Sequence, residues 1–161
     1  MSHLRARFTL LIVSGVLLGS AVGTAQASAM TVTVAIKTQD KVIKNAAAYK
    51  SLTHLNANTP AEARKLIVEF KALREHVAHA ATVVAGASAN GTKEKQGQKD
   101  WVTGARDLAS GIGMLDTGLQ DVVKGNAAAA KAVLRKAQLT LSRADAVAAK
   151  ADKLLGLPTS D

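Results

Sequence analysis

Apolar residues recur every three or four positions along most of the chain after residue 36. The clearest run follows a single heptad template, with apolar side chains at Ala63, Leu66, Phe70, Leu73, Val77, Ala80, Val84 and Ala87. Spacing of this kind gathers apolar side chains on one face of an α-helix. It predicts a helix over 60–87, and the same pattern predicts helices over 101–124 and 127–155.

Signals at the helix ends support these bounds. The segment Thr59-Pro60-Ala61-Glu62 combines an N-cap threonine, a proline at the first helical position and a glutamate three residues after the cap, which together form a capping box. Gly125 is expected to end one helix and Asn126 to cap the next. Gly156, followed by a proline, is expected to end the last helix, which leaves residues 157–161 as a short tail.

The remaining segments are less sharply marked. Residues 36–56 show a weaker helical pattern. Residues 30–35 read Met-Thr-Val-Thr-Val-Ala, and the alternation of β-branched residues predicts an extended leader. Residues 88–99 are polar and rich in lysine, so we expect a connection there, with Asp100 as the N-cap of the following helix.

These elements predict one all-α domain over residues 36–156. The expected architecture is an antiparallel up-down four-helix bundle, because two of the three connections are only a few residues long and short connections favour antiparallel neighbours. Aromatic residues make up only 2% of the chain, so the heptad-patterned core must be rich in alanine and glycine and its helices must lie close together. Two alternatives remain open: a three-helix core with a loosely attached first helix, and an elongated hairpin that dimerises.

The first 29 residues have the features of a secretory signal peptide. Arg5 and Arg7 precede an apolar run over 8–22, and overlapping small-x-small motifs follow. This order predicts cleavage after Ala27 or Ala29 and a secreted, periplasmic or otherwise extracytoplasmic protein. The apolar run is shorter than the roughly 20 residues that a membrane-spanning helix needs, and the chain has no cysteine to carry a lipid.

Basic residues outnumber acidic ones. The chain carries 21 Lys and Arg against 12 Asp and Glu, for a formal net charge of +9. Such a charge favours anionic partners, and we expect Lys93, Lys95 and Lys99 to contact an anionic lipid or a cell-wall polymer. Solubility is the simpler explanation, because the lysines are spread along all the helices. Nucleic acid is not an expected partner, because few aromatic side chains are present to stack on bases.

Glycines occur at positions 97, 104, 111, 118 and 125, a strict seven-residue period. The interior ones lie in the apolar stripe of the helix over 101–124, in a row that we call the glycine seam: Trp101, Gly104, Leu108, Gly111, Leu115 and Gly118. Each interior glycine destabilises a helix by about 1 kcal/mol relative to alanine. Close packing of a neighbouring helix is the favoured explanation. A groove for a ligand or partner helix, and a labile helix that opens into a membrane, are the alternatives.

Residues that could carry chemistry are few. His76 and His79 lie three apart in the helix over 60–87 and are the weak candidates for a metal site, but two imidazoles do not fill a tetrahedral site. The sequence contains no Gly-x-Ser-x-Gly motif and no glycine-rich phosphate loop after a strand. The helix over 127–155 has neither His nor Met to ligate haem. We therefore expect no catalytic residues, no enzyme activity and no cofactor.

The sequence thus predicts a non-enzymatic, secreted helical-bundle protein of the cell envelope or extracellular space. It would act by associating with a second copy or a helical partner protein, or by binding to anionic surfaces. One alternative is a small-ligand or metal carrier that uses the bundle interior or His76 and His79. The other is a membrane-active secreted factor.

Overall fold

The structure is a computed structural model of the 161-residue chain and describes residues 30–53, 57 and 59–158. These residues form the closely packed helices α1 (Val32–Asn45), α2 (Ala47–Thr53), α3 (Pro60–Ala85), α4 (Thr92–Val123) and α5 (Ala127–Leu155). None of the described residues belongs to a β-strand, so the prediction of an all-helical fold is confirmed. The predicted signal peptide, residues 1–29, lies outside the described residues.

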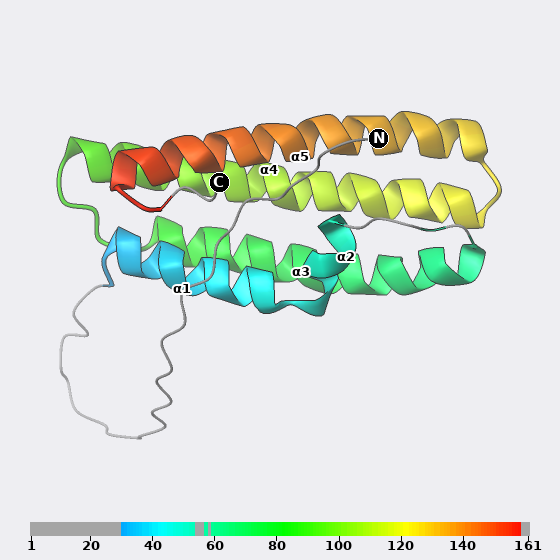
Figure 1. Ribbon diagram of the computed structural model, residues 1–161, viewed down its shortest axis with the longest axis horizontal. Helices are drawn as coiled ribbons and strands as arrows, with labels where there is room; N and C mark the ends of the chain where they lie inside the picture. The colour runs from blue at the N-terminus through cyan, green and yellow to red at the C-terminus, as the bar shows by residue number, and fades with distance from the viewer. Residues whose placement is uncertain (1–29, 54–56, 58, 159–161) are drawn as a thin grey trace, which may run out of the picture.

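Helix α4 lies between α3 and α5 and makes most of its contacts with these two helices. Figure 1 shows the three helices lengthwise beside one another, with the loop from α3 to α4 and the loop from α4 to α5 at opposite ends of the molecule. The shorter helices α1 and α2 pack mainly against α3. Helix α5 therefore forms one long edge of the molecule and leaves much of its surface exposed.

The predicted capping box at the start of α3 is confirmed. The Thr59 hydroxyl accepts a hydrogen bond from the backbone N–H of Glu62 at 3.2 Å, and the Glu62 carboxylate accepts one from the Thr59 N–H at 3.0 Å. The helix ends at Ala85, and its last carbonyls are satisfied from another element. The side-chain amide of Gln98, on α4, donates to the carbonyl oxygens of Val84 at 2.7 Å and Ala87 at 2.8 Å.

The prediction of an extended leader over 30–35 is wrong, because α1 already begins at Val32. Val32, Ala35 and Ile36 are buried, whereas Val34 is 50% exposed, so burial follows helical spacing and not strand alternation. The start of α1 is held by two backbone hydrogen bonds. The Val32 N–H donates to the Ser88 carbonyl at 3.1 Å, and the Ser88 N–H donates to the Met30 carbonyl at 2.9 Å. Tertiary contacts therefore override the β-propensity of this stretch.

Two further boundaries differ from the prediction. The helix expected over 36–56 is broken at Ala46, whose backbone is extended, so that α1 and α2 are separate. The connection expected over 88–99 is short, because α4 begins at Thr92 and Asp100 lies inside the helix instead of capping it. Lys, Glu and Gln are good helix formers, so this polar stretch can extend α4 by more than two turns.

The core follows the predicted stripes. Its fully buried larger side chains are Phe70, Leu73, Val77 and Val84 from α3, Ile112 and Leu119 from α4, and Val32 and Ile36 from α1. Helix α5 contributes mainly alanines, with Ala130, Ala137, Ala144 and Ala151 all buried. Because alanine is small, α5 can lie close to α4 only where α4 also has small side chains.

Candidate functional site

The glycine seam of α4 faces α5. A methyl group added to Gly111 would come 2.7 Å from Cδ2 of Leu141, and one added to Gly118 would come 2.8 Å from Cδ2 of Leu134. At Gly104 the neighbour is backbone, because an added methyl group would lie 3.2 Å from the Ala144 carbonyl oxygen. The seam is therefore filled by α5 of the same chain, and each glycine lets a side chain or backbone segment of α5 approach closely.

Ion pairs run beside the seam and also join α4 to α5. The Lys150 ammonium lies 2.9 Å from the Asp100 carboxylate, and the Arg143 Nε lies 3.1 Å from the Asp107 carboxylate. The two acids are seven residues apart on α4 and the two bases seven residues apart on α5, in opposite order along the chain. Asp100 is buried, and the hydrogen bond from Lys150 lowers its pKa.

Charge is distributed unequally between the surface and the interior. Of the basic residues in the described part of the chain, all except Lys41 and Lys44 are exposed. Of the acidic residues there, only Glu62, Glu75 and Asp145 are exposed. The surface is therefore more positive than the net charge alone indicates, because most acidic side chains are partly covered.

The outer surface of α5 carries an extended patch of this charge. At 100° per residue, six exposed bases lie opposite its buried alanine and leucine stripe: Lys131, Arg135, Lys136, Arg143, Lys150 and Lys153. We call these residues the α5 basic face. The acidic residues of α5 are Asp145 and Asp152. Both lie outside the α5 basic face, on the flank of the helix that borders α1. By contrast, the exposed surface of α3 mixes bases with Glu62 and Glu75.

Lys93, Lys95 and Lys99, the predicted anionic-surface contacts, are all exposed. They lie on the first two turns of α4 and not on a loop. This end of α4 packs beside the last turn of α5, since a methyl group on Gly97 would come 2.6 Å from Cγ of Leu155. The three lysines therefore lie at the Lys153 end of the α5 basic face.

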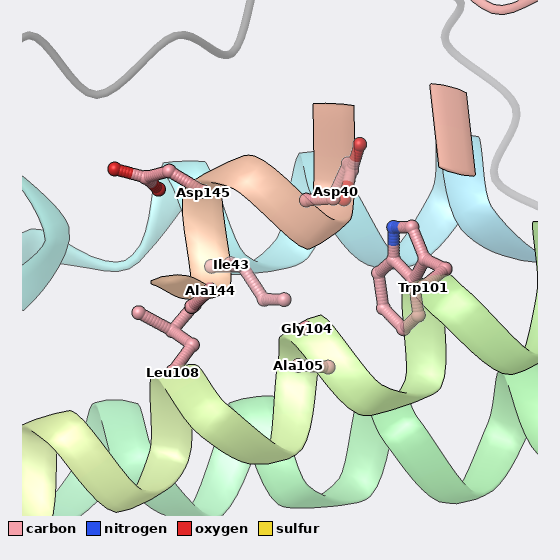
Figure 2. A pocket seen from close by; sticks show the side chains of 9 residues that line it. Asp40, Ile43, Trp101, Gly104, Ala105, Leu108, Ala144 and Asp145 are labelled. Atoms are coloured by element: carbon pink, nitrogen blue, oxygen red, sulfur yellow. The ribbon is translucent and has the colours of Figure 1, made fainter. Parts of the chain in front are cut away.

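A small pocket lies where α1 meets α4 and α5. It is lined by Asp40 and Ile43 of α1, by Trp101 and neighbouring residues of α4, and by Ala144, Asp145 and Ala148 of α5. Figure 2 shows Asp40 and the ring nitrogen of Trp101 on the same side of the hollow, with the Asp145 carboxylate turned away from them. The space inside is about 20 Å³, which holds a water molecule but not an organic cofactor.

Asp40 is the most perturbed acid of this pocket. Burial raises its pKa to about 7, against the opposing effect of the Lys44 ammonium, while the Asp152 carboxylate raises it further. The Trp101 indole N–H donates a hydrogen bond to Asp40 and favours the charged form. Burial also lowers the pKa of Lys44 and raises that of Asp152. This cluster links α1 to α5, and Asp40 is the member whose pKa lies near 7.

No third ligating side chain joins the two candidate histidines in the described residues. His76 and His79 are both exposed on α3. Nowhere in residues 30–53, 57 and 59–158 do three or more His, Cys, Asp or Glu side chains gather as they would around a metal ion. In the same part of the chain, none of the helices combines the length and the hydropathy needed to cross a bilayer.

Sequence reasoning missed the α5 basic face and the Asp40 pocket. The face has a readable signal, because every Lys and Arg of residues 127–155 falls away from the predicted apolar stripe. The Asp40 pocket has no such signal in the sequence, because its walls come from three distant segments. The residues from α4 and α5 lie about 60 and about 100 positions after Asp40 of α1. Comparison of the chain with protein-family models, curated proteins and solved structures finds no match, so its function must be inferred from its own residues.

Proposed function

We propose that this chain is a non-enzymatic protein of the cell envelope or extracellular space that acts by binding an anionic surface. The observation that carries the proposal is the unequal exposure of charge. Bases are exposed throughout the described residues, whereas most acids are half-buried or buried. A surface of one sign attracts partners of the opposite sign and accelerates their encounter.

Binding through a helical partner at the glycine seam has less support. The seam is occupied by α5, and an added methyl group at any of its three glycines would already be crowded. A carrier function also has less support, because the pocket beside Asp40 holds about one water molecule. Surface binding needs neither an open seam nor a large cavity.

The proposal includes the finer architecture and the export of the chain. We propose an antiparallel up-down bundle in which α1 and α2 together stand where the sequence predicts one first helix. Along the contact between the two helices, residue numbers rise on α4 as they fall on α5, from Gly97 against Leu155 to Gly118 against Leu134. This order supports opposite directions for α4 and α5. Removal of residues 1–29 during export would bring the protein to envelope polymers and lipid head groups.

The test is retention of the purified, exported protein on immobilised polyglutamate, with a neutral dextran resin as the control. We expect retention on polyglutamate alone at low ionic strength, and release as added salt screens the charges. Passage through both resins without retention at low salt would contradict the proposal.

A further inference from the structure

We infer that the α5 basic face is a docking surface for a bilayer that contains anionic phospholipid. This inference rests on the proposed function and names its partner. The face follows a continuous helix of 29 residues, about 44 Å long at 1.5 Å per residue. Figure 1 shows α5 along an outer edge of the molecule, beside α4.

The charge of the face fits a surface covered with phosphate groups. Its six bases are spread over about six turns, and the two acids of α5, Asp145 and Asp152, lie nearer the buried stripe of the helix than these bases do. Two of the bases, Arg143 and Lys150, also pair with acids of α4, which offset part of their charge. Lys131, Arg135 and Lys136 lie together near the start of α5 and provide the most concentrated positive charge. Basic clusters of this kind bind anionic lipid head groups.

An exposed apolar residue in the face distinguishes a bilayer from a hydrophilic polymer. Leu139 is 66% exposed, and Arg135, Lys136 and Arg143 lie three or four residues from it on the same helix surface. An apolar side chain among basic ones enters the boundary between head groups and acyl chains when such a helix lies on a membrane. A carboxylated or phosphorylated polymer in water offers Leu139 no comparable apolar environment.

The experiment measures binding of the exported protein to vesicles of phosphatidylcholine, with and without phosphatidylglycerol. We expect binding only when phosphatidylglycerol is present. Lys131→Gln, Arg135→Gln and Lys136→Gln together should weaken it on the order of 100-fold. The matched control removes as many charges from α3, with Arg64→Gln, Lys65→Gln and Lys71→Gln, and should change binding by less than about threefold. Circular dichroism checks that each variant is folded.

A second pair of variants tests the bilayer contact itself. Leu139→Ser should weaken vesicle binding about fivefold and leave retention on polyglutamate unchanged. The control is Val68→Ser on α3, because Val68 is 71% exposed and also lies among basic residues. This control should change neither vesicle binding nor retention on polyglutamate. The inference would be overturned if the α5 and α3 triple variants lost vesicle binding equally. It would also be overturned if Leu139→Ser left vesicle binding unchanged. If the protein is retained on polyglutamate but does not bind the vesicles, the bilayer inference is overturned and the proposed function stands. If the protein binds neither polyglutamate nor vesicles, both the inference and the proposed function are overturned.

Discussion

Gly104 of α4 lies against the backbone of Ala144 on α5, where an added methyl group would come 3.2 Å from the carbonyl oxygen. Gly104→Ala should therefore destabilise the protein, because the backbone of α5 must move away. The expected loss from overpacking, about 1–3 kcal/mol, exceeds the gain in helix propensity, about 1 kcal/mol. Urea unfolding measures the difference.

The control for this prediction is on the same helix. A methyl group at Gly113 would meet only the Arg74 guanidinium at an ordinary 3.5 Å. Gly113→Ala should therefore stabilise α4 by up to about 1 kcal/mol. If Gly104→Ala were as stabilising as Gly113→Ala, close packing would not explain the regular seven-residue spacing of the glycines in the seam.

The Asp100–Lys150 pair should contribute stability at neutral pH and lose it in acid. The folded-state pKa of Asp100 is lowered, so its contribution is present above the pKa of the unfolded carboxyl and disappears as pH falls through the folded value. Lys150→Gln should cost about 1 kcal/mol at pH 7, since Lys150 is largely exposed. Unfolding at pH 7 and pH 2 should show the difference shrinking in acid, and a constant difference would count against the ion pair.

Asp40 should make the protein less stable as the pH rises, which is the reverse of the pH dependence expected from Asp100. The pKa of Asp40 is raised from 3.8 to about 7 in the folded state, so the folded protein binds a proton that the unfolded chain has lost between these values. Stability should therefore fall as pH rises from 4 to 7, by no more than about 4 kcal/mol. Asp40→Asn should remove this decline, as measured by thermal unfolding across the interval. Parallel pH profiles for the variant and the wild type would show that Asp40 titrates normally.

Gln98 should stabilise the end of α3. Its side-chain amide donates to three carbonyl groups there, those of Val84, Ala85 and Ala87. Gln98→Ala removes all three hydrogen bonds and should destabilise the protein by about 1–2 kcal/mol. Amide hydrogen exchange should be faster in the last turn of α3, while Gln138→Ala, at an exposed glutamine of α5, serves as the control. Unchanged exchange in that turn would contradict the capping role.

Local chemistry made much of the fold predictable. The capping box at Thr59 fixes the start of α3, and Gly156, with a positive φ of 64°, ends α5 where a left-handed residue is needed. Asn126 precedes α5 as expected, although its side chain makes no capping hydrogen bond. The heptad stripes identify the buried faces of α3, α4 and α5, because helical periodicity depends only on nearby residues.

The errors have a tertiary origin. The segment at Val32 is helical because its buried side chains meet α3 and its backbone pairs with Ser88, and neither contact is visible in the local pattern. Helix α4 begins early in a stretch of helix-forming residues, where the packing of Gly97 against Leu155 extends the contact with α5 beyond the predicted stripe. The Asp40 pocket likewise requires knowledge of which helices become neighbours. Periodicity predicts a buried face but not its partner.

The central claim, that α5 presents the surface that meets an anionic partner, is tested most directly by site-specific labels. The chain has no cysteine, so Ala146→Cys on α5 and Ala72→Cys on α3, both exposed positions, each accept a single environment-sensitive fluorophore. Vesicles that contain phosphatidylglycerol should shift the emission of the label at position 146 and leave that at position 72 unchanged. An equal shift at both positions, or a shift at position 72 alone, would contradict the claim.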